Sequence, residues 1–187
     1  MRLLSLAATA AFVLAATNPA NAHEVDEGKG KLGQVSFANS CDAKVQKELQ
    51  RAVAMLHSFW FSAGEKAFRH VLEDDPSCGV ATFGIAALLM NNPLAGQGAS
   101  PKAAEAAQAA IEQGRKVGAK TQRERDYIDA VAAYYADFAN RPERARQQAR
   151  AQAFEALAAK YPDDDEAQIF AALYVAGEVE DLAEGFE

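Results

Sequence analysis

The sequence has few of the residues and motifs from which catalytic sites are built. It has three histidines and two cysteines in 187 residues, and the cysteines form no CxxC pair. The spacing typical of zinc sites is therefore absent. There is no G-x-S-x-G sequence, no P-loop and no Rossmann glycine run, so no motif indicates acyl transfer or nucleotide binding. We predict a protein that is not an enzyme and needs no cofactor.

Basic residues are also in the minority. The chain has 19 lysines and arginines against 26 aspartates and glutamates, which gives a formal net charge of −7. A nucleic-acid binder needs a basic face to neutralise phosphates. We therefore expect no nucleic-acid partner.

The one long hydrophobic run stands at the N-terminus. Residues 3–16 are almost continuously apolar, and the small-residue sequence Ala20-Asn21-Ala22 follows them. This pattern is typical of a signal peptide, and no later segment has the roughly 20 apolar residues that a membrane span requires. We interpret residues 1–22 as a signal peptide cleaved after Ala22, with an uncleaved anchor as the alternative. The protein is then periplasmic or secreted, with no stable membrane span after cleavage.

The cysteines fit an oxidising compartment. Cys41 and Cys78 are the two in the chain, and a pair of cysteines in an exported protein predicts a disulfide. The alternatives are two buried thiols or metal ligation, although no histidine stands at a suitable spacing.

From Ser40 onwards, apolar residues recur at spacings of three and four, which is typical of amphipathic helices. No segment shows strand-like alternation between turn signals, so the predicted fold class is all-α. We expect about seven antiparallel-paired helices. They cover about residues 40–60, 62–75, 79–90, 101–117, 122–138, 142–160 and 165–177. Ser100-Pro101 has the cap and first-turn proline of a helix start, and Thr121 with Glu124 has the spacing of a capping box.

The chain divides into four segments. The signal peptide is followed by a flexible N-terminal arm at residues 23–39, which is polar and lacks periodicity. The helical domain covers residues 40–177, and an acidic C-terminal tail covers residues 178–187. Within the domain, residues 91–100 are rich in glycine, asparagine and proline, which predicts a loop.

Two of the predicted helices end in the same way, with phenylalanine, leucine and a closing proline. The residues are Phe68, Leu72 and Pro76 in one helix, and Phe154, Leu157 and Pro162 in the other. This ending resembles the tetratricopeptide repeat (TPR), a 34-residue helix–turn–helix with an A-x3-F pattern and a closing proline. Gly64 stands where alanine is usual. The two prolines are 86 residues apart, which is no multiple of 34, so the middle pair of helices is expected to be degenerate or lengthened.

A closer resemblance is to the N-terminal part of large secreted bacterial TPR proteins of unassigned function. Segments 51–68, 75–78, 118–128 and 160–173 carry it. The resemblance implies a TPR-like α-solenoid with Trp60 and the six residues above in the repeat core. In such a solenoid the first helices of successive hairpins lie side by side, which would bring Cys41 and Cys78 together. Asn92-Pro93-Leu94-Ala95 departs from the His-Pro-Leu-Trp type of sequence usual in those proteins.

The most concentrated positive patch lies at the start of the 142–160 helix. It consists of Arg141, Arg144, Arg146 and Arg150, with Arg123 and Arg125 upstream. The simpler interpretation of the first four is a solvated helix face with Arg–Glu pairs. The functional interpretation, which makes them candidate partner-binding residues, is a docking site for an acidic peptide or a carboxylate.

Histidines and acidic clusters are the remaining candidates for chemistry. A metal site would require His57 and His70 to converge with a third ligand. We expect His70 to be solvated and His57 to pack beside Trp60. The acidic runs 73–75 and 163–165 lie at helix junctions, where carboxylates stabilise the N-terminus of the next helix, and we assign them structural roles.

The favoured hypothesis is a periplasmic scaffold that holds a protein or peptide partner along a concave solenoid face. One alternative is a metal- or small-ligand-handling protein with residues 91–100 as a lid. Another is a truncated chain whose binding site lay in C-terminal repeats that are missing here.

Overall fold

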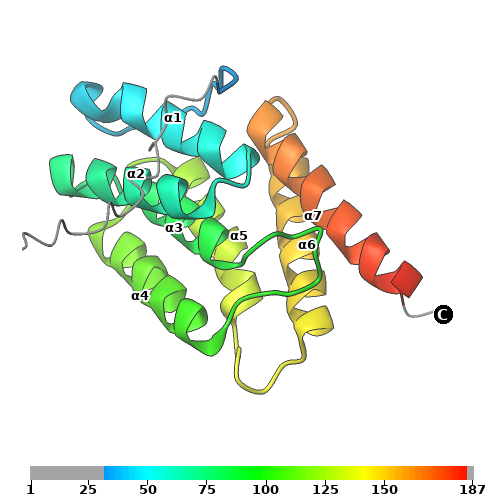
Figure 1. Cartoon of the computed structure of the whole chain (residues 1–187). Coiled ribbons are helices and arrows are strands. Elements are labelled where there is room, and N and C mark those ends of the chain that lie inside the picture. Colours follow the sequence, from blue (N-terminus) through cyan, green and yellow to red (C-terminus); the bar gives the residue numbers. More distant parts are fainter. Residues whose placement is uncertain (1–31, 185–187) are drawn as a thin grey trace, which may run out of the picture.

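The computed structural model describes residues 32–184, and every regular element in that range is helical (Figure 1). A single 3-10 turn, η1 (Ala43–Val45), precedes the α-helices. They are α1 (Gln46–His57), α2 (Phe61–Asp74), α3 (Ala81–Leu89), α4 (Pro101–Val117), α5 (Gln122–Tyr135), α6 (Glu143–Lys160) and α7 (Asp165–Glu184). The prediction of an all-α fold is confirmed for this part of the chain. The predicted signal peptide, residues 23–31 of the predicted arm and residues 185–187 of the predicted tail lie outside the described residues.

Neighbouring helices pack as hairpins along the chain. Each helix contacts the next, and α3 also contacts both α1 and α5. In Figure 1 the hairpins follow one another around the molecule, from α1–α2 to α6–α7. This arrangement is compatible with a solenoid of helical hairpins.

Both predicted helix starts are present. The Ser100 side chain accepts a hydrogen bond from the Ala103 N–H, and Pro101 stands in the first turn of α4. Thr121 and Glu124 form a complete capping box at α5, with bonds in both directions. Local side-chain chemistry therefore fixes where α4 and α5 begin, because these bonds satisfy backbone N–H groups that have no partner inside the helix.

An aromatic cluster forms the centre of the core. Its five members are fully buried and come from five segments: Phe37, Phe83, Tyr127, Phe154 and Phe170. The ring of Phe83 lies 5.1 Å from that of Tyr127 and 5.3 Å from that of Phe170, both edge to face. Such pairs add about 0.5–1.5 kcal/mol each beyond the burial of area, so the cluster ties α3, α5 and α7 together.

The prediction of a flexible arm is wrong for residues 32–39, the part of the arm that the structure describes. Phe37 is 1% exposed and belongs to the aromatic cluster. Its N–H donates to Gln50 Oε1 at 2.7 Å, and Gln50 Nε2 donates to its carbonyl at 2.8 Å. A single buried phenylalanine in a polar segment produces no periodicity, which is why the sequence pattern did not reveal it.

Of the seven residues predicted for the repeat core, three are exposed: Trp60, Pro76 and Pro162. Phe68, Phe154 and Leu157 are buried and Leu72 is partly buried, whereas Pro76 and Pro162 are exposed just beyond the ends of their helices. Gly84 faces the ring of Phe68 so closely that a Cβ there would overlap it.

The placement of Trp60 in the core is wrong. Its side chain is 37% exposed, because α1 ends at His57 and residues 58–60 form the turn into α2. Phe59 adopts a positive φ of 56° in this turn. Trp60 therefore lies outside the helix face that packs inwards.

The predicted boundary at residue 177 is also wrong. Helix α7 continues past it as far as Glu184. Part of the predicted acidic tail is therefore helical.

Candidate functional site

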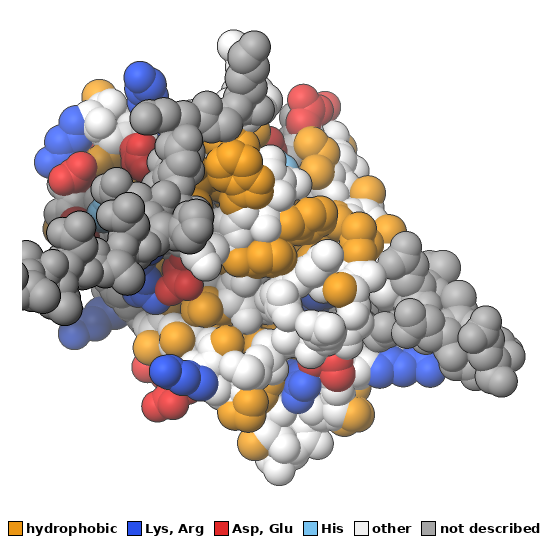
Figure 2. Space-filling view, viewed as in Figure 1, with side chains coloured by type: hydrophobic (Ala, Val, Ile, Leu, Met, Phe, Trp, Pro, Cys, Tyr) orange, Lys and Arg blue, Asp and Glu red, His pale blue; other side chains and the backbone are white. Residues whose placement is uncertain are grey.

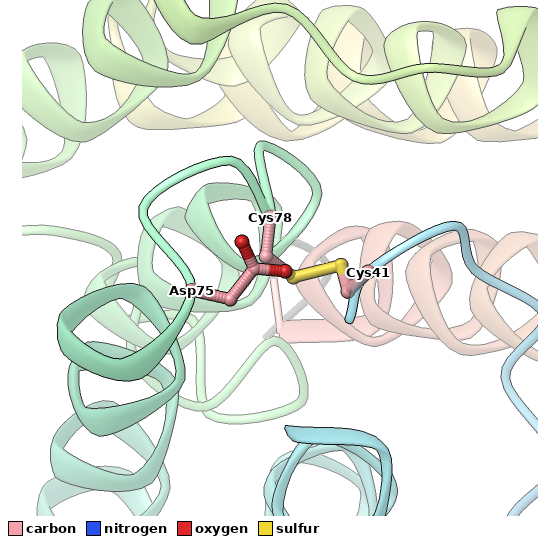
Figure 3. Close-up of side chains that lie close together, drawn as sticks. All are labelled: Cys41, Asp75 and Cys78. Atoms are coloured by element: carbon pink, nitrogen blue, oxygen red, sulfur yellow. A yellow bond between two sulfur atoms is a disulfide. The ribbon is translucent and has the colours of Figure 1, made fainter. Parts of the chain in front are cut away.

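The predicted disulfide is present and joins the segment before α1 to the segment before α3. The Cα atoms of Cys41 and Cys78 are 4.8 Å apart, and the sulfurs are bonded (Figure 3). Asp75 lies beside them, and together the three residues are the one group able to hold a metal that residues 32–177 contain. The sulfurs are bound to each other, however, and Asp75 accepts hydrogen bonds from the N–H groups of Asp42 and Ser77 at 2.7 and 3.0 Å. In this oxidised state the cluster is a structural junction.

The two histidines do not converge. His57 Nε2 lies 2.7 Å from Glu166 Oε2, and the imidazole stacks on Phe170 at 4.9 Å. His70 is exposed on α2. His57 therefore links the end of α1 to the start of α7, and its ring partner is Phe170 and not the Trp60 that we expected.

The arginines predicted as one exposed docking patch do not form one. Arg141 donates to the carbonyls of Ala133, Ala136 and Ala145. Arg146 pairs with Glu143 at 2.6 Å, and its guanidinium lies 4.0 Å from the ring of Phe138. These two side chains fold inwards and hold the turn between α5 and α6.

The other two arginines of that group differ completely from each other. Arg144 is exposed, whereas Arg150 is 1% exposed and is the largest fully buried side chain in residues 32–177. The prediction of a surface patch failed because α6 packs on two sides, against α5 and against α7. One of its arginines therefore points into the interior.

Two tyrosine rings flank the buried guanidinium of Arg150. Its Cζ atom lies 4.5 Å from the ring centroid of Tyr174 and 5.7 Å from that of Tyr134. Nε and Nη2 have no hydrogen-bond partner, and no carboxylate of residues 32–177 pairs with them. Burial lowers the pKa of Arg150, and the neighbouring tyrosine hydroxyls and the nearby Glu143 carboxylate only partly offset this effect. We call Arg150, Gln147, Tyr134 and Tyr174 the Arg150 node.

A polar network lies beside the Arg150 node without satisfying it. Tyr134 Oη donates to Glu143 at 2.8 Å, and Gln147 Nε2 donates to the same carboxylate at 3.1 Å. Burial raises the pKa of Tyr134 to about 12, and the bond to Glu143 contributes to this rise. Gln147 Oε1, like the two nitrogens of Arg150, is buried and has no partner.

The loop at residues 91–100 covers this region. It leaves α3, crosses towards α6 and α7 and returns to α4 (Figure 1). The carbonyl of Pro93 lies so close to Gly177 that a Cβ there would overlap it, and the same Cβ would stand 3.6 Å from Arg150 Nη2. At the other end, the Ala99 N–H donates to Tyr134 Oη at 2.9 Å. The loop therefore packs on Gly177 and Tyr134, two residues that lie beside the guanidinium.

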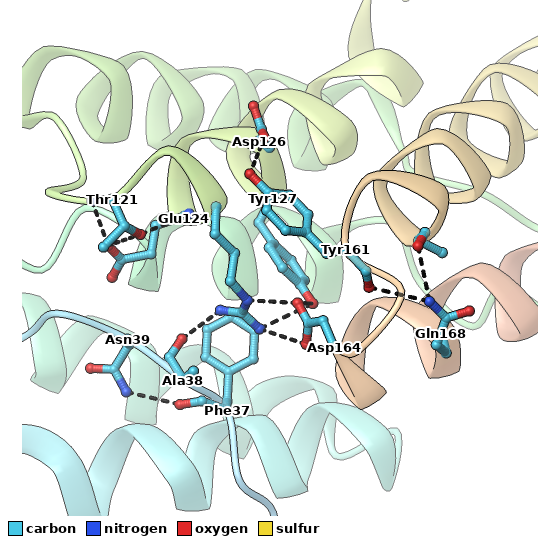
Figure 4. Close-up of polar contacts among 12 residues, drawn as sticks. Phe37, Ala38, Asn39, Thr121, Glu124, Asp126, Tyr127, Tyr161, Asp164 and Gln168 are labelled. Carbon is cyan, nitrogen blue, oxygen red and sulfur yellow. Dashed lines mark hydrogen bonds and ion pairs between the residues drawn. The ribbon is translucent and has the colours of Figure 1, made fainter.

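A second arginine, Arg123, also lies against two aromatic rings. It stands at the start of α5, whereas Tyr134 of the Arg150 node stands near the end of the same helix. Its guanidinium lies 4.7 Å from the ring of Phe37 and 4.6 Å from that of Tyr127. Nε and Nη2 bind both oxygens of Asp164 at 2.6 and 2.8 Å, and Nη1 donates to the carbonyl of Ala38 (Figure 4). We call Arg123, Phe37, Tyr127 and Asp164 the Arg123 node.

The acid of the Arg123 node also caps a helix. Burial would raise the pKa of Asp164, but the bonds from Arg123, Tyr127 and the Ala167 N–H hold it below its usual value. Asp164 therefore has the structural role that we predicted for its acidic run.

An exposed aromatic surface lies at the turn between α1 and α2. Trp60 is exposed there. The rings of its two sequence neighbours, Phe59 and Phe61, stack on each other with their centroids 6.3 Å apart. We call these three residues the aromatic ledge. A groove of about 390 Å³ adjoins it, and its lining includes Phe61, Leu88 and Leu89 as well as residues 97–100 of the loop. Figure 2 shows hydrophobic side chains gathered over this turn and towards α7.

The sequence pattern missed both the exposure of the aromatic ledge and the burial of Arg150. The spacing of Arg150 from Ala153, Phe154 and Leu157, which places it near the inner face of the helix, could have indicated its burial. No protein-family model, curated protein or solved structure matches the chain. The functional argument therefore rests on the geometry of these two regions.

Proposed function

We propose that the protein is a non-catalytic, TPR-like helical scaffold that acts in the periplasm or outside the cell and binds a protein or peptide partner through the aromatic ledge. The observation that carries this proposal is the exposure of Trp60, which is 37% exposed at the tip of a turn. A large aromatic side chain left partly in water at such a position is typical of a binding hot spot, because tryptophan contributes a large apolar area to an interface.

The backbone of the turn supports this proposal. Phe59 has φ 56°, a conformation that costs a bulky residue of order 1–3 kcal/mol and is concentrated at functional positions. Hydrogen bonds from the N–H groups of Phe59 and Trp60 to the carbonyls of Leu56 and Met55 hold it in place. The ledge is therefore a fixed platform, which lowers the entropy lost when a partner binds.

The adjoining groove suits an extended peptide. Its lining combines the apolar side chains of Leu88 and Leu89 with the polar side chains of Glu65, Gln97 and Ser100. Apolar contacts with a few polar groups that fix the orientation of the ligand are usual in binding pockets. The partner that we propose is a peptide segment with an aromatic or aliphatic anchor.

The export of the protein is part of the same proposal. The disulfide supports it, since such bonds form and persist in oxidising compartments, and the signal-peptide pattern of residues 1–22 agrees with it. Within residues 32–184, no helix combines the length and the apolar character required to cross a membrane. The helical hairpins are compatible with the TPR resemblance, which remains part of the proposal.

The test uses the single tryptophan of the chain as a reporter. Peptides are selected from a display library against the wild type and then titrated while Trp60 emission is followed. We expect them to shift the emission and to bind Trp60→Ala at least about tenfold more weakly, as hot-spot residues do. The control is Ile169→Ala, which removes another exposed apolar side chain, on α7. Peptides that leave the emission unchanged and bind both variants like the wild type would contradict the proposal.

A further inference from the structure

Arg150 is the buried group whose chemistry the fold does not explain. Its neighbours Arg141 and Arg146 are satisfied by carbonyls and by Glu143, and Arg123 is satisfied by Asp164. Arg150 is more deeply buried than any of them, yet two of its nitrogens have no partner. Removing a charge from water costs several kcal/mol when no partner compensates.

The two unpartnered nitrogens form one edge of the planar guanidinium. In four other arginines of this protein the same edge, Nε with Nη2, binds a carboxylate. They are Arg69 with Glu65, Arg115 with Asp129, Arg123 with Asp164 and Arg146 with Glu143. This edge matches the two oxygens of a carboxylate in distance and in plane. Arg150 presents the same edge with no carboxylate from residues 32–177 upon it.

We propose that Arg150 is the anchor of a binding site for a small carboxylate ligand, closed by the loop at residues 91–100. The Nε–Nη2 edge binds the carboxylate. The rings of Tyr134 and Tyr174 hold the guanidinium in place and keep water away from it. Desolvation strengthens this ion pair, because the attraction between charges rises as the local dielectric constant falls.

Gln147 narrows the class of ligand. Its Oε1 is a buried acceptor without a donor, and the bond from Nε2 to Glu143 fixes which end of the amide is the oxygen. Gln147 and Arg150 stand three positions apart on α6, so they share a face of the helix. A carboxylate with a hydroxyl or amino group on the adjacent carbon would satisfy both residues. The ligand class is therefore a small hydroxy acid or amino acid.

Movement of the loop at residues 91–100 would let a ligand reach Arg150. Since Arg150 is 1% exposed, a ligand reaches it only when the cover moves. The cover is a segment with positive φ at Asn91, Gly96 and Gly98, and Pro93 rests on Gly177 beside the guanidinium. The loop has no helix or strand of its own, so it can open without unfolding the helices beneath it. The same loop also lines the groove beside the aromatic ledge, but the carboxylate site uses none of the three ledge residues. Trp60→Ala therefore tests the first proposal and Arg150→Met tests the second.

The test compares four probes on the full exported chain: L-lactate, glycine, acetate and inorganic phosphate. We expect L-lactate or glycine to raise the melting temperature with increasing concentration and to slow amide hydrogen exchange in residues 91–100. Acetate, which offers no donor to Gln147, binds more weakly. In Arg150→Met the affinity falls roughly ten- to hundredfold, as expected for the loss of charge-assisted hydrogen bonds. In Gln147→Leu, L-lactate loses its advantage over acetate.

Two controls make the result decisive. Arg115→Met removes an exposed arginine that pairs with Asp129 and leaves binding unchanged. Arg150→Met itself melts no lower than the wild type, since an apolar side chain replaces an uncompensated buried charge, so loss of binding is not loss of folding. The proposal is overturned if none of the carboxylates raises the melting temperature, if Arg150→Met binds as the wild type does, or if phosphate alone binds.

Discussion

The Arg123 node and the Arg150 node are two versions of the same construction. Each places a guanidinium against two aromatic rings within the helical stack. In the Arg123 node the guanidinium donates hydrogen bonds to a carboxylate, a backbone carbonyl and a phenol oxygen. In the Arg150 node the same edge of the guanidinium has no partner from residues 32–177. The two nodes therefore differ in whether the chain itself provides the anion, and our proposal of a ligand site at Arg150 rests on this difference.

The surroundings of the Arg123 node are also held by more bonds than those of the Arg150 node. Beside the Arg123 node, Ser40 donates to Glu124 through both its N–H and its hydroxyl, at 2.8 and 2.6 Å, and the disulfide of Cys41 follows directly. Above the Arg150 node lies a loop without regular structure, held by Pro93 and Ala99. One region is held by a disulfide and side-chain hydrogen bonds, and the other is covered by a loop without helix or strand.

The largest expected effect comes from removing the charge of the Arg123 node. Arg123→Met removes the charged partner of Asp164, which keeps only the hydrogen bonds from Tyr127 and the Ala167 N–H, so we expect the free energy of unfolding to fall by about 3–5 kcal/mol. Arg150→Met is the matched variant, and its free energy of unfolding is expected to stay equal or to rise. Urea unfolding of the two proteins measures the difference. Equal losses in both variants would break the comparison between the nodes.

The disulfide is expected to contribute nearly as much. Replacing Cys41 and Cys78 by alanine opens a loop of 37 residues, for which the chain-entropy relation gives about 4 kcal/mol. The measurement is urea unfolding of the double variant against the wild type under non-reducing conditions. Amide exchange should rise around Ser40 and Phe37 and stay unchanged in residues 91–100. A variant as stable as the wild type would show that the hydrogen bonds of Ser40 hold the segment alone.

Displacing the loop should have a smaller effect on stability and a local effect on dynamics. Gly177→Ala places a methyl group against the carbonyl of Pro93, and overpacking of this kind costs about 1–3 kcal/mol. We expect faster amide exchange in residues 91–100 and weaker binding of L-lactate. The control is Gly114→Ala, where the added methyl meets the side chain of Thr82 and the loop should be unaffected. If both variants change the loop equally, Gly177 has no special relation to it.

Part of the pH dependence of stability should come from the Arg123 node and the adjacent Glu124, beside the contributions of Asp75 and Asp126, whose pKa values are also lowered. The pKa values of Asp164 and Glu124 are lowered in the folded protein. For such groups the stabilisation is complete above the unfolded-state pKa, near 4, and is lost as the pH falls through the lower folded-state value. We expect the urea midpoint to fall as the pH drops below about 4, with a shallower fall in Arg123→Met. An unchanged slope in that variant would mean that other acids control the acid transition.

The smallest expected effect on stability is that of Trp60→Ala. The indole is 37% exposed, so only part of its area is lost from the core and we expect a change of about 1 kcal/mol or less, as for most surface substitutions. Urea unfolding gives the value. A loss as large as the 3–5 kcal/mol of a buried tryptophan would return Trp60 to the core and remove the support for the aromatic ledge.

The sequence was sufficient to predict the helices and the starts of two of them, whereas the first helix begins at Gln46 and not near Ser40. Periodicity fixed the fold class, and cap chemistry at Ser100 and Thr121 fixed two boundaries, because both signals are local. The pairing of Cys41 with Cys78 followed from the cysteine count and the compartment. Phe37 was missed because one buried residue has no period. Trp60 was misplaced because a turn, and not a helix face, carries it.

Most of the candidate site could not be predicted from the sequence. The run of arginines on α6 was visible, but which of them turn inwards depends on how α6 packs between α5 and α7. The lack of a partner for Arg150 depends on every side chain around it, from the loop to α7. Neither property is encoded in local spacing, so both required the three-dimensional arrangement.

The most direct measurement is of the guanidinium itself, by ¹H–¹⁵N NMR of the arginine Nε–H groups during titration with L-lactate. The resonance that is missing from the spectrum of Arg150→Met identifies Arg150. We predict that this signal moves with increasing L-lactate while that of the exposed Arg115 stays fixed. An Arg150 signal that stays in place while residues 91–100 open freely, or that moves no more than Arg115, would contradict the account.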